Sequence, residues 1–90
     1  MKHILFELRG CPWNLLDDSE FVVLALQVSA VHANSKLLDV TFHKFEPQGV
    51  TGLALLADSH ISIHTWPEKG LAMCDIFTCG VDATPELAVE

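Results

Sequence analysis

The sequence predicts an α+β fold, a two-layer α/β sandwich in which a mainly antiparallel sheet carries helices on one face. Its 90 residues allow one domain, which we expect to span residues 1–90. Half of the residues are hydrophobic, which is enough for a single modest core. One helix-like segment and several strand-like runs, bounded by turn residues, complete the pattern.

The first expected elements are a strand and a helix. Residues 2–9 end in alternating apolar and polar side chains, which predicts a strand that the breakers at 10–12 terminate. A helix is expected over about residues 17–33, because acidic residues and a plausible cap precede its apolar run. The apolar residues expected on its one broad buried side are Phe21, Leu24, Leu26, Val28 and Val31.

Four strand-like runs follow the helix. They are Leu37–Phe45, Val50–Ala57, His60–Trp66 and Leu71–Cys79. The second run is nearly all apolar, which predicts a strand covered on both faces. In the third run the side chains alternate, and one face carries His60, Ser62, His64 and Trp66. Thr84 and Pro85 predict the start of another helix.

Charge and composition exclude several classes of function. The net charge of −7 argues against a nucleic-acid-binding surface, which needs clustered Lys and Arg, and is compatible with a cationic ligand. The apolar run at the N-terminus is too short for a signal peptide, and no stretch is long enough for a membrane span. Three cysteines without a signal sequence indicate reduced thiols, so we expect a cytoplasmic protein.

The densest polar segment is 58–68, and its residues alone leave three interpretations open. A metal site could use His60 and His64 with His43 or Cys79, but residues four apart on a strand lie about 13 Å apart. A nucleophile could be Ser59 or Cys79 with His64 as base, although no nucleophile elbow is present. The third interpretation is a solvated sheet face without chemistry. The sequence offers no pair of closely spaced metal ligands, so no metal is expected.

A family resemblance favours a fourth interpretation. The segments that carry it are 42–52 (FHKFEPQGVTG), 58–68 (DSHISIHTWPE) and 75–80 (DIFTCG). Together with the first strand they make residues 2–80 resemble the short, prokaryotic-type S-adenosylmethionine decarboxylases. The resemblance implies a proenzyme that cuts itself between Asp58 and Ser59, giving chains 1–58 and 59–90, and a pyruvoyl cofactor made from Ser59.

The resemblance also implies roles in self-cleavage. The Ser59 hydroxyl attacks the carbonyl of Asp58 to give an ester, and elimination followed by loss of ammonia leaves the pyruvoyl group. His64 matches the histidine that handles protons in this processing, and Thr51 stands where the family commonly has an assisting serine. Asp58 stands where glutamate is usual, but the attacked carbonyl is unchanged.

Turnover and substrate binding are implied for other residues. A ketone joined to the substrate amine as a Schiff base accepts the electrons released by decarboxylation. Cys79 matches the proton donor that then reprotonates the carbanion. Phe45 and Trp66 match positions that contact the nucleoside end, and aromatic faces suit both adenine stacking and the positive sulfonium. Glu68 matches the acid that binds the ribose hydroxyls. The expected substrate is S-adenosylmethionine, and the product is the aminopropyl donor for spermidine synthesis.

Two alternative functions and a homodimeric assembly are also expected from the sequence. One alternative keeps the pyruvoyl chemistry but takes an amino acid such as ornithine or arginine. The other is a regulatory homologue that never cuts itself. Family members usually continue beyond residue 80 through a full helix and a final strand, whereas only residues 81–90 follow here. We therefore expect a C-terminally shortened fold and a homodimer of processed protomers that covers the exposed surface.

Overall fold

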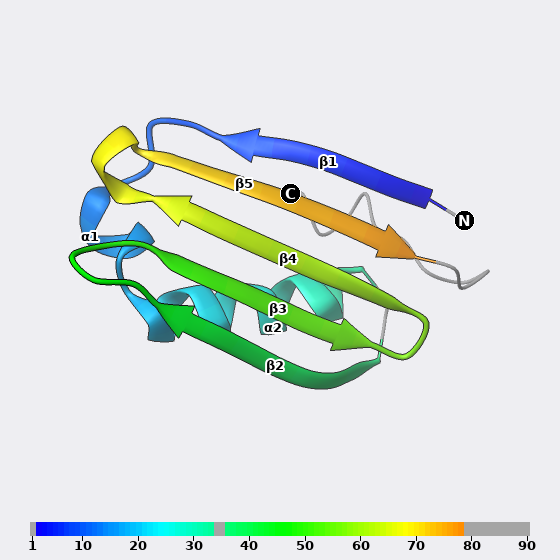
Figure 1. Cartoon of the computed structure of the whole chain (residues 1–90). Helices are drawn as coiled ribbons and strands as arrows, with labels where there is room; N and C mark the ends of the chain where they lie inside the picture. Colours follow the sequence, from blue (N-terminus) through cyan, green and yellow to red (C-terminus); the bar gives the residue numbers. More distant parts are fainter. Residues whose placement is uncertain (1, 34–35, 79–90) are drawn as a thin grey trace.

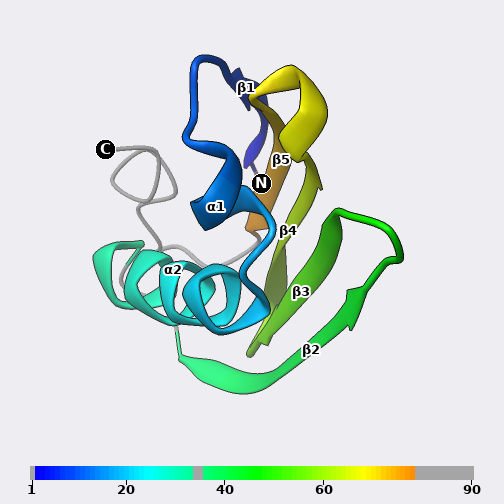
Figure 2. The same cartoon turned by 90° about the vertical axis from the view of Figure 1, so that its left-hand side faces the viewer.

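A computed structural model describes residues 2–33 and 36–78, and in this part of the chain the predicted two-layer α+β fold is confirmed. Its strands are β1 (Lys2–Leu8), β2 (Leu37–Lys44), β3 (Val50–Leu56), β4 (Ser59–Trp66) and β5 (Leu71–Thr78). Its helices are α1 (Trp13–Leu16), α2 (Ser19–His32) and the short 3₁₀ helix η1 (Pro67–Lys69). The strands form one antiparallel sheet in the order β1-β5-β4-β3-β2 (Figure 1). Both α-helices lie on the same side of it (Figure 2).

The strand positions agree with the sequence-based expectations to within a few residues. Gly49 and Gly70, both with positive φ, stand immediately before β3 and β5, as the turn signals predicted. The short helix α1 was not expected from the sequence. Cys79 and the helix start expected at Thr84 lie outside the described residues, as does the shortened C-terminal part.

Helix α2 confirms the predicted helix, but it begins at Ser19 instead of about residue 17. Asp18 caps it, because its side-chain oxygen accepts hydrogen bonds from the backbone N–H groups of Glu20 (3.0 Å) and Phe21 (3.3 Å). The helix packs across β2, β3 and β4, and the main core lies between it and the sheet. The buried residues of this core are Leu26, Ala30, Ala54, Leu56, Ile61 and Ile76.

The buried side of α2 differs from the prediction. The side that faces the sheet carries Val22, Leu26 and Ala30, each four residues from the next. Of the expected set, only Leu26 is buried, and the exposed ones are Phe21, Leu24, Val28 and Val31. The helix is apolar around most of its circumference, so its pattern did not single out one face. The packed side is the one that approaches the sheet closely: a Cβ on Gly52 in β3 would stand 2.8 Å from a Leu26 methyl carbon.

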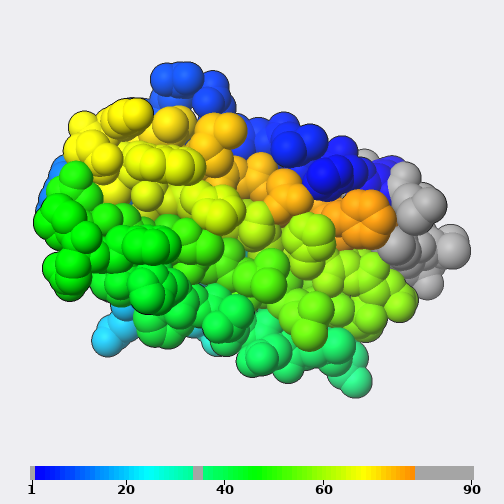
Figure 3. Space-filling view, viewed as in Figure 1, coloured from blue at the N-terminus to red at the C-terminus, as the bar shows by residue number. Residues whose placement is uncertain are grey.

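The face of the sheet opposite the helices, called the open face from here on, carries no covering layer among the described residues (Figure 3). Strand β3 alternates buried and exposed side chains, with Leu53 37% and Leu55 48% exposed. The prediction that this strand is covered on both faces is therefore wrong for the single chain. Cross-strand pairing puts further residues on the open face, namely His3, Leu5, Thr51, His60, Ser62, His64, Met73, Asp75 and Phe77. Among the described helices, none is long and apolar enough to cross a membrane.

Candidate active site

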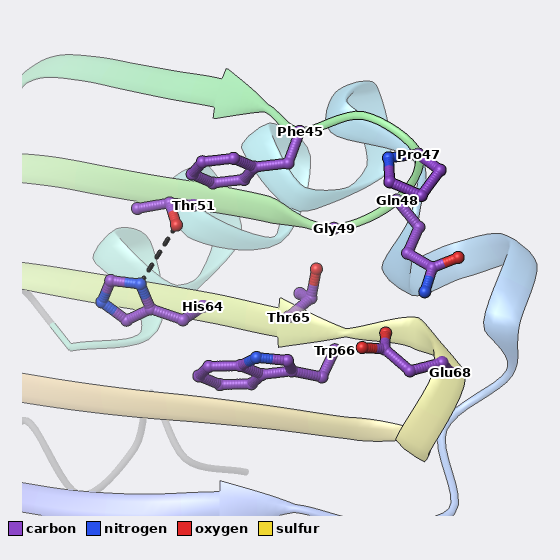
Figure 4. A pocket seen from close by; sticks show the side chains of 9 residues that line it. All are labelled: Phe45, Pro47, Gln48, Gly49, Thr51, His64, Thr65, Trp66 and Glu68. Atoms are coloured by element: carbon purple, nitrogen blue, oxygen red, sulfur yellow. Dashed lines mark hydrogen bonds between the residues drawn. The ribbon is translucent and has the colours of Figure 1, made fainter.

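A pocket of about 410 Å³ opens at the end of the sheet where β4 runs into η1 and where the loop between β2 and β3 turns (Figure 4). This volume lies in the range usual for small-molecule sites. The residues that line it are Phe45, Pro47, Gln48, Gly49, Thr51, His64, Thr65, Trp66 and Glu68. Five of the residues singled out from the sequence therefore meet here: Phe45, Thr51, His64, Trp66 and Glu68.

The walls of the pocket are aromatic and its centre is polar. Phe45, just after β2, and Trp66, at the end of β4, lie on either side of the Thr51–His64 pair (Figure 4). Their side chains are 46% and 38% exposed, so both rings have faces free to take a flat ligand. Thr51 and His64 are cross-strand partners, and the Thr51 hydroxyl lies 3.1 Å from Nδ1 of His64. Glu68 is exposed in the first turn of η1, beside Trp66.

The loop that forms one wall of the pocket is held by Asp17, at the end of α1. One Asp17 carboxylate oxygen accepts a hydrogen bond from the Gly49 N–H at 2.8 Å. The same oxygen forms an ion pair with Nζ of Lys44, also at 2.8 Å. The Lys44 contact and then the Gly49 N–H hold the pKa of Asp17 below its ordinary value. In the sequence Asp17 stands only as part of the acidic start of a helix, because its partners are distant in the chain.

A second tether comes from Thr65, whose side chain faces the helices. Its hydroxyl donates to the Leu16 carbonyl at 2.8 Å and accepts the N–H of Val50 at the same distance. Thr65 is 6% exposed, so these bonds are shielded from water. The pocket is thus built on a rigid junction between α1, β3 and β4.

Ser59 does not lie in this pocket. Asp58 ends the two-residue turn between β3 and β4, and Ser59 is the first residue of β4, so the bond between them is at the opposite end of the strand from His64 (Figure 1). His64 is five residues further along the strand than Ser59, a length of about 16 Å. Within one chain, therefore, the expected nucleophile and its expected proton carrier are far apart. Cys79 lies outside the described residues.

Of the metal ligands weighed from the sequence, the three that the structure describes, His43, His60 and His64, do not gather at one place. His43 and His64 lie at the pocket end of the sheet, where His43 packs edge-on against Phe45 at 4.5 Å between ring centres. His60 instead joins His3 and Asp75 near the other end. Burial raises the pKa of Asp75, but hydrogen bonds from Ser62, His3 and His60 outweigh this and lower it to about 2. No sequence pattern predicts this grouping, because its members come from three separate strands.

Comparison with known proteins identifies the family. The family model described as S-adenosylmethionine decarboxylase matches residues 2–90. The chain belongs to the S-adenosylmethionine decarboxylase family. The resemblance found in the sequence is thereby confirmed, and with it the α+β sandwich architecture of this family.

Individual relatives in the S-adenosylmethionine decarboxylase family are similar over nearly the whole chain. The S-adenosylmethionine decarboxylase proenzyme of Synechococcus sp. strain WH7803 is 53% identical over 89 residues, which are 99% of this chain and 70% of the relative. The proenzyme of Methanococcus vannielii is 57% identical over 86 residues, 94% of this chain and 70% of the relative. The crystal structure of the adenosylmethionine decarboxylase from Aquifex aeolicus matches with a TM-score of 0.88 at 40% identity, covering 97% of this chain and 72% of that one.

Proposed function

We propose that this chain is the proenzyme of a pyruvoyl-dependent S-adenosylmethionine decarboxylase, which makes the aminopropyl donor for spermidine synthesis. The observation that carries the proposal is the pocket with two aromatic walls and a carboxylate, found in a chain about half identical to proteins named S-adenosylmethionine decarboxylase proenzyme. A cytoplasmic location and the absence of nucleic-acid and membrane partners stay predictions.

The substrate is recognised through its adenosine and its sulfonium. Phe45 and Trp66 offer aromatic faces on which adenine stacks and which attract the positive sulfur. Glu68 accepts hydrogen bonds from the ribose hydroxyls, a contact that a free amino acid cannot make. This argument favours S-adenosylmethionine over ornithine or arginine as the substrate.

Ser59 fits the cofactor role by its position. It follows directly after an exposed two-residue turn, and the carbonyl that its hydroxyl would attack belongs to the adjacent residue Asp58. The hydroxyl attacks this carbonyl, the resulting ester eliminates the upstream chain as a carboxylate, and water replaces the nitrogen of the remaining dehydroalanine as ammonia leaves. The pyruvoyl group supplies a ketone that accepts the electrons left by departing carbon dioxide.

Two further residues are assigned to proton transfer. His64, whose Nδ1 is hydrogen-bonded to the Thr51 hydroxyl, moves protons during self-cleavage. Cys79 returns a proton to the decarboxylated substrate, which remains a prediction because this residue is not described.

A homodimer resolves the separation of Ser59 from His64. If two open faces stack in opposite directions about a two-fold axis, the turn end of one protomer faces the pocket end of its partner. The open face carries the apolar side chains that such an interface needs, since Leu5 is 72%, Leu55 48% and Met73 40% exposed. We infer that each site combines Ser59 of one protomer with Thr51 and His64 of the other.

Intact-mass analysis tests the self-cleavage. The purified chain is expected to give fragments 1–58 and 59–90, the second beginning with a keto group. Ser59→Ala is expected to leave the 9.9 kDa chain intact, whereas Ser29→Ala in α2 is cut like the wild type. A wild-type chain that stays whole after long incubation would instead support the regulatory alternative.

Carbon dioxide release tests the substrate. The processed protein is incubated with carboxyl-labelled S-adenosylmethionine, ornithine or arginine in parallel. Release from S-adenosylmethionine alone is expected. Release from either amino acid at a comparable rate would contradict the proposed recognition of adenosine.

A further inference from the structure

Three side chains with metal-binding atoms converge on the open face, where His60 lies four residues before the pocket residue His64 on β4. Nε2 of His3 in β1 and Nε2 of His60 in β4 lie 2.8 and 3.0 Å from the same oxygen, Oδ2 of Asp75 in β5. The three atoms all lie within 4.8 Å of one another. Because the residues come from three neighbouring strands, this convergence is a product of the folded sheet and not of local sequence.

The cluster is held in place by its neighbours. Phe77 pairs with His3 on one side and with His60 on the other, and its ring contacts both imidazoles at 5.6 and 6.0 Å between centres. The Ser62 hydroxyl donates to the other carboxylate oxygen of Asp75, Oδ1. The two imidazoles and the carboxylate are therefore oriented, with one Asp75 oxygen left to face both ring nitrogens.

The donor set is the one that divalent transition metals prefer. Two imidazole nitrogens and one carboxylate oxygen suit Zn²⁺ and its neighbours in the first row, whereas Mg²⁺ and Ca²⁺ take oxygen ligands almost exclusively. In tetrahedral zinc the ligand atoms stand about 3.3 Å apart. The two nitrogen–oxygen separations here, 2.8 and 3.0 Å, reach that value by small side-chain rotations.

The cluster is also accessible to a metal ion and is placed where an ion could link two parts of the chain. The side chains of His3, His60 and Asp75 are 45%, 37% and 22% exposed in the single chain, so an ion can reach all three before the open faces of two protomers pair. His3 precedes the Asp58–Ser59 bond, and the other two residues follow it. An ion bound here would link the two chains that the cut produces.

We propose that His3, His60 and Asp75 form a binding site for Zn²⁺ or a related divalent transition metal ion, with the remaining coordination position taken by water. The site uses none of the residues assigned to the pocket. It exists in the cut and in the uncut chain, so it does not depend on the proposed self-cleavage.

Long equilibrium dialysis of the full chain against Zn²⁺, with the bound metal quantified by mass spectrometry, tests the site. About one Zn²⁺ per chain is expected. His60→Gln and Asp75→Asn are each expected to lower the affinity at least about tenfold, because one ligand is lost. His32→Gln is the matched control, since His32 lies in the last turn of α2 and is exposed there; it should bind like the wild type.

Thermal unfolding and Co²⁺ spectra make the result decisive. Zn²⁺ should raise the melting temperature of the wild type and of His32→Gln, but not that of His60→Gln, which circular dichroism first shows to be folded. Co²⁺ should give visible d–d bands without the thiolate charge-transfer band of a cysteine ligand. Sub-stoichiometric binding by the wild type, or full binding by both ligand variants, would show that the cluster is only a carboxylate–histidine hydrogen-bond network.

Discussion

At the scale of single residues, the contact between Thr51 and His64 is the most direct link between geometry and the proposed chemistry. The hydroxyl orients the imidazole through a hydrogen bond at Nδ1, so Nε2 is the ring nitrogen that would exchange a proton. Thr51→Ser keeps this hydroxyl and Thr51→Val removes it with little change of volume. The pair of variants therefore separates the hydrogen bond from packing.

We expect Thr51→Val to slow self-cleavage about fivefold, the usual consequence of losing one hydrogen bond worth about 1 kcal/mol. Thr51→Ser should stay close to the wild-type rate. The rate is followed by the disappearance of the intact chain on denaturing gels. Thr41→Val, a matched change on the neighbouring strand β2, is the control. Equal rates for Thr51→Val and Thr51→Ser would mean that the hydroxyl has no part in the cut.

At the scale of secondary structure, Gly52 sets how closely α2 approaches the sheet. A methyl group there would stand 2.8 Å from Leu26 Cδ1 and 3.3 Å from methyl carbons of Val22 and Ile63. Gly52→Ala is therefore expected to lower the free energy of unfolding by about 1–3 kcal/mol, the usual cost of overpacking a core. Urea unfolding followed by circular dichroism measures the change.

The Leu26→Ala background shows whether the clash is the cause. Removal of the Leu26 side chain makes room for the new methyl group, so Gly52→Ala should cost clearly less in Leu26→Ala than in the wild type. Strictly additive effects of the two substitutions would rule out this contact as the reason.

Asp17 acts at the same scale, because it ties the loop between β2 and β3 to α1. Its pKa is lowered in the folded protein, so the stability that its charge contributes is present above the unfolded value of about 4 and is lost as the pH falls through the folded value. Asp17→Asn should thus be less stable than the wild type near neutral pH, and the difference should shrink as the pH falls below about 4. Thermal unfolding between pH 7 and pH 3 measures this difference, and Asp39→Asn on β2 is the control. A deficit that stays constant into acid would show that the charge is not what matters.

The elements also show what the sequence could and could not predict. The strands were placed well because Pro47, Gly49 and Gly70 mark their ends, and such breakers act locally. The prediction of the buried side of α2 was wrong because exposed Val31 and Leu24 are as apolar as buried Leu26. Which side packs is decided by the space above Gly52, a tertiary contact. The pocket residues were found through the family motif. The Asp17–Gly49 and His3–Asp75 contacts were not predicted, because each joins residues far apart in the sequence, 32 and 72 positions respectively.

At the scale of the whole molecule, the strand order explains how a cut chain can stay folded. A break between Asp58 and Ser59 would leave β4 and β5 as a separate chain. In the order β1-β5-β4-β3-β2 these two strands lie in the middle of the sheet, between β1 and β3 of the upstream chain (Figure 1). Ladders on both sides would hold the downstream chain in place. The sequence predicted the strands but not this order, which depends on pairing between distant segments.

The arrangement of two protomers determines how Ser59 meets His64, because within one chain His64 lies about 16 Å along the same strand. If each site is shared between two protomers, a dimer of Ser59→Ala with His64→Asn contains one complete site, formed by Ser59 of the second chain and His64 of the first. Co-expression of the two variants, separated by different affinity tags, should therefore restore cutting of the His64→Asn chain only. Each variant expressed alone should stay intact, as should a mixture of Ser59→Ala with the double variant. If the His64→Asn chain remains uncut in the mixed dimer, Ser59 and His64 do not act across an interface. If it is cut when expressed alone, His64 is not needed for the reaction.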